Sequence, residues 1–338
     1  MSHSGGTVTS PAGTRLRVDA DRGVWSLEAD GRRVAGEAGL QLQLGPLAPC
    51  PGEEPLPLAA STVLSFGPAR CATDSTSDRL GRGKRVVLER TLPGGLHASA
   101  ALTLLAEASA LAVDLALENR GAVPLGVLAL RPACDAKIDL GGPAERCTVL
   151  SSDYWFAERR SVRLDEQAET TEWWSTAVVD RSSERALAIG IAEAANAGVS
   201  FCVWRDGSRV RATVSADLSP GRSPSPLRLL PGAQFRLCRL LFVVGQQVHA
   251  GLELYAELVA RNAPVALRHR TYAGLFTGYS SSPDLTTVVP LDQARVARLL
   301  GVLRDKVGRY GLDYEAISGG QRPAAASPVA PAPGAAQV

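Results

Sequence analysis

The sequence predicts a mostly β protein whose main part is a large antiparallel sandwich. Three observations lead to this prediction. Between residues 15 and 245, short segments rich in β-branched and aromatic residues follow one another. Turn residues separate these segments at short intervals, as in sandwich proteins. The chain has 338 residues, of which 45% are hydrophobic, so it is long enough to bury an extended core.

The individual strands are predicted from their period and from the turns beside them. Residues 40–44 alternate Leu and Gln, which is typical of a half-buried strand. Asp206-Gly207 predicts a hairpin between residues 199–205 and 210–214. Ala and Leu make residues 97–118 ambiguous, but turn signals on both flanks favour two strands that meet near Glu107 and Ala108. Further strands are expected at residues 85–91, 174–179 and 235–244.

The hydrophobic period changes after residue 247. Apolar residues at helical spacing predict a helix between residues 249 and 261, with a face made of Leu252, Tyr255, Ala256, Leu258 and Val259. A second helix is expected over residues 291–310, followed by a short strand at 312–317. Residues 272–317 therefore predict one strand–helix–strand unit, which belongs in a larger parallel sheet.

Composition argues against several classes of partner. The chain has 36 basic and 34 acidic residues, a near balance that argues against a nucleic-acid or membrane-surface partner. No apolar run reaches the ~18–20 residues of a membrane helix. The six cysteines form no CxxC pair and the start of the chain lacks an apolar segment, so we expect reduced cysteines and a cytoplasmic location. The four scattered histidines predict no metal site, and no cofactor is expected.

Two short motifs that partly match catalytic or phosphate-binding patterns are interpreted as ordinary loops. Residues 278–282 (GYSSS) lack the final glycine of a GxSxG nucleophile turn. Residues 79–85 contain four basic side chains but lack the Ser or Thr of a phosphate-binding loop, and they precede a strand rather than a helix. We interpret this basic run as a solvated loop that leads into the strand.

Two aromatic clusters are candidates for sugar contact. They contain Trp155 in one cluster and Trp173 and Trp174 in the other. Exposed Trp rings stack on sugar rings, whereas in a sandwich the same residues also fill a core or an interface, and packing stays the alternative. Four acidic residues lie between the clusters: Asp165, Glu166, Glu169 and Glu172. Paired carboxylates hydrolyse glycosides across a cleft, but this spacing is more typical of a solvated loop.

The order of these features resembles the N-terminal region of glycoside hydrolase family 36, which includes α-galactosidases and raffinose-synthase-like enzymes. Four stretches carry the resemblance: residues 119–125 (NRGAVPL), 174–191 around Asp180, 230–232 (LPG) and 254–256 (LYA). Across residues ~15 to 321, the resemblance implies a galactose-mutarotase-like β-supersandwich, then a linker helix, then the start of a (β/α)8 barrel.

The start of that barrel departs from the family pattern. Family members carry a motif like G-W-N/C-S-W-Y and later I-D-D-G-W-Q, whereas this chain has Leu275 and Gly278 in place of the two Trp, and Ser318 and Gly319 in place of the two Asp. The resemblance thus implies a degenerate sugar site, whose positions are Gly274, Tyr279, Ser318, Gly320 and Gln321. No residue aligns with the catalytic carboxylates, so no catalytic residue is predicted.

The expected organisation has five parts: a flexible leader at residues 1–14, the β-supersandwich at 15–247, the linker helix at 248–270, the incomplete barrel at 271–321 and a disordered Ala/Pro tail at 322–338. We expect a non-catalytic sandwich that binds carbohydrate or a partner, including a second copy of the chain. One alternative is a fragment or subunit of an active, retaining α-galactosidase-type glycosidase whose barrel is supplied elsewhere. The other is a structural or oligomerisation module without sugar affinity.

Overall fold

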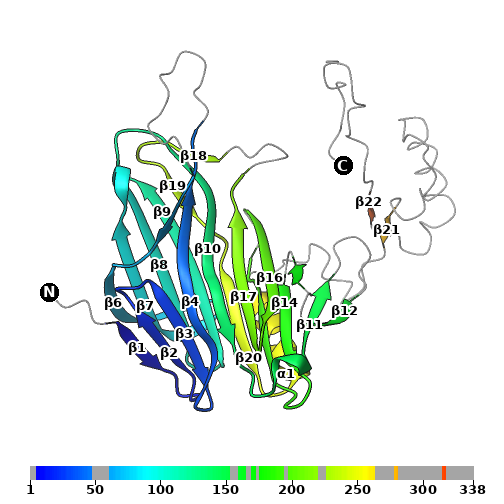
Figure 1. Ribbon diagram of the computed structural model, residues 1–338. Helices are drawn as coiled ribbons and strands as arrows, with labels where there is room; N and C mark the ends of the chain where they lie inside the picture. Colours follow the sequence, from blue (N-terminus) through cyan, green and yellow to red (C-terminus); the bar gives the residue numbers. More distant parts are fainter. Residues whose placement is uncertain are drawn as a thin grey trace, which may run out of the picture. The chain divides into compact units, whose positions relative to one another are not determined.

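A computed structural model describes residues 5–47, 61–152, 159–164, 169–172, 175–193, 197–219, 226–262, 278–280 and 314–316. The chain divides into two compact units, residues 1–265 and 266–338. The first unit contains two ten-stranded sheets whose strands pair antiparallel throughout (Figure 1). The predicted fold class, a mostly β protein built on a large antiparallel sandwich, is confirmed.

The first sheet, called sheet I, joins strands from both ends of this unit. Its main path runs, in spatial order, through β1 (Gly6–Thr9), β2 (Arg15–Asp19), β3 (Val24–Ala29), β4 (Arg32–Leu44), β10 (Leu125–Ile138), β17 (Arg209–Asp217), β16 (Gly198–Asp206) and β13 (Glu169–Glu172). Two short strands lie off this path: β5 (Thr62–Ser65) pairs with β4, and β18 (Leu227–Leu229) pairs with β10.

The second sheet, called sheet II, faces sheet I across the core. Its main path runs through β12 (Arg159–Arg163), β11 (Cys147–Ser152), β14 (Ser175–Asp180), β15 (Ala186–Ile191), β20 (Leu240–Gly245), β9 (Ala110–Asn119), β8 (Leu96–Leu105), β7 (Gly81–Thr91) and β6 (Arg70–Asp78). The short β19 (Gln234–Arg236) pairs with β9. Two 3-10 turns, η1 (Pro93–Gly95) and η2 (Ala144–Arg146), lie between strands.

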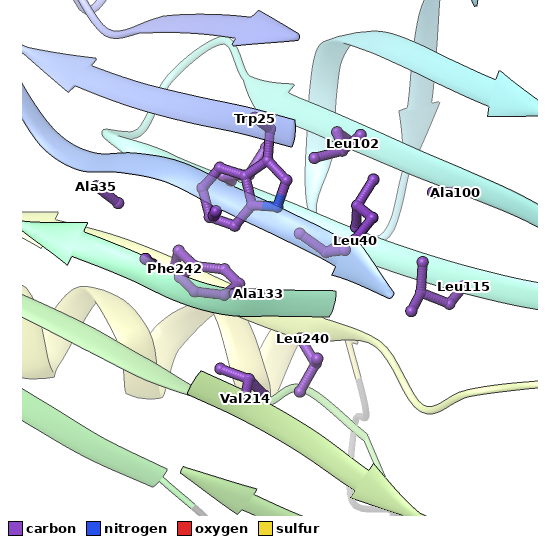
Figure 2. Close-up of a cluster of buried hydrophobic side chains, with 14 of the residues drawn as sticks. Trp25, Ala35, Leu40, Ala100, Leu102, Leu115, Ala133, Val214, Leu240 and Phe242 are labelled. Carbon is purple, nitrogen blue, oxygen red and sulfur yellow. The ribbon is translucent and has the colours of Figure 1, made fainter. Parts of the chain in front are cut away.

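The core is filled by alternate residues of both sheets. Leu40, Leu42 and Leu44 of β4 are buried, so the predicted period-two strand is confirmed. At the centre, the indole of Trp25 from sheet I meets the ring of Phe242 from sheet II edge to face, with centroids 4.9 Å apart (Figure 2). The Trp25 Nε1–H donates a hydrogen bond to the carbonyl oxygen of Pro132 at 2.9 Å, so the buried indole has a partner for its polar atom.

The helix predicted between residues 249 and 261 is α1 (Val248–Asn262), which packs on β15 and β20. Leu258 is fully buried in a second apolar cluster, and the Tyr255 hydroxyl donates to the carbonyl oxygen of Ile191 at 2.8 Å. Burial raises the pKa of Tyr255 to about 12. Gly190 allows this approach, because a Cβ at that position would collide with the Tyr255 hydroxyl. Ala256 is exposed, so its predicted place on the packed face is wrong.

The hairpin predictions are mostly confirmed. The ambiguous segment forms β8 and β9, which are separated at Ala106–Ser109 as the turn signals predicted. Strands β16 and β17 form the hairpin expected around Asp206-Gly207. Its register pairs Asp206 with Arg209, which moves the two-residue turn to Gly207 and Ser208. Gly207 adopts a φ of 59°, which a residue without a Cβ adopts at little cost.

Two predictions about strands are also wrong. The single strand expected at residues 235–244 is two strands, β19 and β20, because the register against β9 shifts by one residue between Arg236 and Leu240, where Arg239 contacts acidic side chains of other strands. The basic run at 79–85 is a loop only at residues 79 and 80, because β7 begins at Gly81. Three of its four cations, Arg82, Lys84 and Arg85, lie on β7, and Arg85 forms an ion pair with Asp74 of β6 at 2.6 Å.

The second unit contains β21 (Gly278–Ser280) and β22 (Tyr314–Ala316), which pair in parallel. A parallel pair is what a strand–helix–strand connection produces. The helix predicted at 291–310 and the rest of the expected barrel start lie outside the described residues, so the incomplete barrel stays a prediction.

None of the helices that the structure describes is long and apolar enough to span a membrane.

Candidate functional site

The face of sheet I that points away from the core is polar across its four central strands, β4, β10, β17 and β16. This polar face is made of the residues that alternate with the core residues: Glu37, Gln41 and Gln43 on β4, Arg131, Asp135 and Lys137 on β10, Arg211 and Thr213 on β17, and Ser200, Cys202 and Trp204 on β16. Most of them are half-buried, so the face presents hydrogen-bonding groups that are already partly held by their neighbours.

One row of this face crosses all four strands. Trp204 lies opposite Arg211, and Arg211 lies opposite Lys137 in the antiparallel registers. Lys137 in turn forms an ion pair with Glu37 of β4. The row therefore places an aromatic ring, two cations and a carboxylate side by side.

Two residues of the face adopt a left-handed backbone at irregularities of the sheet. Glu37 has a φ of 52° where the β3–β4 register shifts, and Asp135 has a φ of 55° where the β10–β17 register shifts. Bulges and left-handed residues other than glycine are concentrated at functional sites, where they re-aim side chains. Both carboxylates are held in place: Asp135 accepts from Arg211 at 2.6 Å, and Glu37 pairs with Lys137.

A cavity of about 600 Å³ opens at one end of the row. Glu37 and Lys137 line it, together with Glu28, Asp139 and Arg209. Each of its three carboxylates has a cationic partner: Glu28 lies 3.1 Å from Arg17, Asp139 lies 3.5 Å from Arg32, and Glu37 pairs with Lys137.

The charges in this cavity favour binding over proton transfer. The hydrogen bond from Lys137 lowers the pKa of Glu37, so this carboxylate stays ionised at neutral pH. Cys147 also lines the cavity, but burial raises the pKa of its thiol to about 11, and a protonated thiol is a poor nucleophile. Within the described part of the chain, no group of three or more His, Cys, Asp or Glu side chains is arranged to hold a metal ion.

Most of the site residues predicted from the sequence lie outside the described residues. These are Trp155, Trp173, Trp174, Gly274, Ser318, Gly320 and Gln321. Tyr279 lies in β21, where it is paired with Glu315 of β22. The structure therefore does not test the sugar-stacking prediction or the degenerate barrel site.

Trp204 is not among the site residues predicted from the sequence, although the alternation along its strand indicates its position. Val199, Phe201 and Val203 are core residues of β16, so strict alternation places Trp204 on the opposite face.

Two of the stretches that carry the family resemblance meet in the structure. The buried Asn119 side chain donates from Nδ2 to the carbonyl oxygens of Val123 and Leu229, both at 2.8 Å. Its Oδ1 accepts from the Gly121 N–H at 3.0 Å, and its backbone carbonyl accepts from Gly232 N–H at 2.7 Å. Residues 119–125 and 230–232 therefore hold one another, and the motif has a structural role here.

Asp180, from a third stretch, is fully buried yet ionised. Burial raises its pKa, but hydrogen bonds from Ser182, Ser183 and the Gly142 N–H outweigh burial and hold the pKa below its usual value. The two serine hydroxyls lie 2.6 and 2.5 Å from the carboxylate oxygens.

Asp180→Asn is expected to lower the free energy of unfolding at pH 7 by about 2 kcal/mol, because it removes the charge from these hydrogen bonds. A carboxylate whose pKa is lower in the folded state stabilises the fold above its unfolded pKa, and this contribution is lost as the pH falls through the folded value. The difference between wild type and variant should therefore shrink below pH ~4. Urea denaturation between pH 3 and 7 measures it, and a difference independent of pH would contradict the explanation.

The comparisons with known proteins concern the fold. No protein-family model matches the chain, and no curated protein matches its sequence. Among solved structures, a quadruple mutant of the α-N-acetylgalactosaminidase NagBb from Bifidobacterium bifidum matches 89% of this chain and 50% of its own, with 14% identity and a TM-score of 0.51. The GH36 α-galactosidase AgaA from Geobacillus stearothermophilus matches 82% of this chain and 45% of its own, with 13% identity and a TM-score of 0.51.

A galactose mutarotase-like protein from Lactobacillus casei ATCC 334 matches 72% of this chain and 100% of its own, with 10% identity and a TM-score of 0.45. This chain spans about half the length of the two glycosidases. At these identities the likeness is one of fold: the chain has a β-sandwich similar to those found in proteins named for their action on sugars.

Proposed function

We propose that the sandwich binds a carbohydrate on the polar face of sheet I and does not hydrolyse it. The row of Trp204, Arg211, Lys137 and Glu37 beside the cavity carries this proposal.

The chemistry of the row suits a sugar. A pyranose presents C–H groups on one side, which pack against an aromatic ring, and hydroxyls around its rim, which exchange hydrogen bonds with polar side chains. Arg211 and Lys137 donate, whereas Glu37 and Asp135 accept, and hydrogen bonds to charged groups are the stronger ones. The ion pairs hold these side chains in position before a ligand arrives, which reduces the entropy that binding would otherwise cost.

The likeness in fold suggests which sugars to test first. The two glycosidases with similar sandwiches are named for α-linked galactose and N-acetylgalactosamine. We therefore choose galactose, N-acetylgalactosamine and raffinose as ligands and mannose as the control.

Trp204→Ala is expected to weaken galactose binding at least tenfold, which corresponds to about 1.4 kcal/mol. The reason is the loss of the ring on which the sugar packs. Isothermal titration of the full chain measures the affinity, and Trp204→Phe, which keeps an aromatic face, should retain most of it. Equal affinity of wild type and Trp204→Ala would rule out the row as the site.

A second assay separates the proposal from its alternatives. Incubation of the full chain with p-nitrophenyl α-galactoside is expected to release no nitrophenol. Release would favour the alternative in which the chain is part of an active glycosidase. Absence of both hydrolysis and sugar binding, with a second copy bound in sedimentation experiments, would favour the oligomerisation module.

A further inference from the structure

A second cavity of about 600 Å³ lies in the first unit where β6 begins, β7 ends and β8 begins. Three arginines line it, Arg70, Arg90 and Arg120, together with His97. Glu89 is the single carboxylate among its lining residues. This cavity belongs to sheet II, so it is separate from the polar face of sheet I.

The guanidinium groups of Arg90 and Arg120 are held in place by their neighbours. The Arg90 Nη1 donates to the carbonyl oxygen of Ser65 at 2.6 Å and also to that of Gly67. Arg120 forms an ion pair with Glu118 at 2.6 Å, and this contact lowers the pKa of Glu118. Each guanidinium has five N–H donors, so both arginines keep donors beyond those used in these contacts.

Arg70 differs from the other two cations. Its side chain has no ion pair or hydrogen bond within the described part of the chain, although Glu89 lies opposite it in the β6–β7 register. The lining contains three permanent cations and the Glu89 carboxylate, and Glu118 pairs with one of the cations, so one positive charge remains without a compensating carboxylate.

His97 adds a buried atom that lacks a partner. Its Nδ1 is buried and makes no hydrogen bond. Buried polar atoms of native proteins nearly always have a partner, and those without one need an explanation such as a missing ligand or water. His97 lines the cavity, so an oxoanion bound there would lie near its imidazole, although the protein itself covers the Nδ1 atom.

We propose that this cavity binds a tetrahedral oxoanion of the phosphate or sulfate class. Guanidinium groups recognise such anions through parallel N–H donors. Neutral sugars do not need this excess of positive charge, so the inference stands independently of the carbohydrate proposal.

Titration of inorganic phosphate into the full chain tests the proposal, with ionic strength held constant by sodium chloride. We expect saturable binding that Arg70→Gln weakens at least fivefold, since it removes the cation that has no partner. Arg82→Gln is the matched control: Arg82 lies on β7 of the same sheet, away from this cavity, and forms an exposed ion pair with Glu107. Equal weakening by both variants would show general charge screening and overturn the proposal, as would the absence of saturable binding.

The imidazole supplies a readout that charge alone would not move. On addition of phosphate, the proton-coupled 15N resonance of His97 is expected to shift, and His97→Gln identifies that resonance by its loss. Sulfate should produce the same shift and chloride should not. A His97 resonance that stays fixed while phosphate binds would place the anion elsewhere and overturn the proposed site.

Discussion

Replacing Trp25 by alanine is expected to lower the free energy of unfolding by about 3–5 kcal/mol. Trp25 is fully buried at the centre of the sandwich, where its ring packs against Phe242 of the opposite sheet (Figure 2). The substitution removes this inter-sheet contact and leaves a void that close-packed neighbours fill only in part. It also leaves the Pro132 carbonyl without the indole N–H as its donor. Urea denaturation followed by circular dichroism measures the change.

Two further variants separate the contributions at this position. Trp25→Phe keeps an aromatic ring but loses the hydrogen bond to Pro132, so its cost should be smaller, about 1–3 kcal/mol. Val63→Ala is the control, because Val63 is 52% exposed and its truncation should change stability by less than about 0.5 kcal/mol. A loss below about 1 kcal/mol for Trp25→Ala would contradict the central role of this residue.

The parts of the fold that follow from local pattern could be predicted from the sequence. Alternation of Leu and Gln at residues 40–44 reflects the two faces of β4, one in the core and one on the polar face. The split between β8 and β9 was signalled by turn residues, and α1 by apolar residues at helical spacing. In each case the determinant lies within a few residues of the element.

The departures from prediction depend on partners that are distant in the sequence. The register against β9 shifts at residues 237–239, where Arg239 contacts Asp78 and Asp114, more than 120 positions earlier. A pattern within a few residues does not contain this information, so the apolar residues on either side predict one strand. Residues 81–85 of the basic run likewise form strand because β7 pairs with both β6 and β8.

The candidate site could not be predicted from the sequence, for a related reason. Alternation along β16 places Trp204 on the polar face, but the row also needs the registers of four strands that range from β4 to β17. The bulges at Glu37 and Asp135 shift these registers locally, and no sequence pattern predicts these bulges. Single strands can therefore be predicted here, whereas the contacts between side chains of different strands cannot.

Replacing Arg239 by methionine is expected to lower the free energy of unfolding by about 3–5 kcal/mol. Its guanidinium lies 3.0 Å from Asp114 and 2.7 Å from Asp78, and it donates to the Asn262 side chain at the end of α1 at 3.3 Å. Burial lowers the pKa of Arg239, but the two carboxylates outweigh burial and raise it overall. Removal of the cation would leave Asp114, which is 14% exposed, with Arg236 as its remaining cationic partner.

The matched control is Arg261→Met on α1. Arg261 pairs with Glu257 at 3.4 Å, but both side chains are more than half exposed, so the loss should stay below about 0.5 kcal/mol. Adding Asp114→Asn to Arg239→Met should recover part of the stability, because it neutralises the carboxylate that the first change leaves underpaired. Urea denaturation of the four proteins measures this. Similar losses for Arg239→Met and Arg261→Met would mean that the Arg239 contacts are no stronger than an ordinary surface pair, and that the packing of α1 on β15 and β20 holds the helix in place without them.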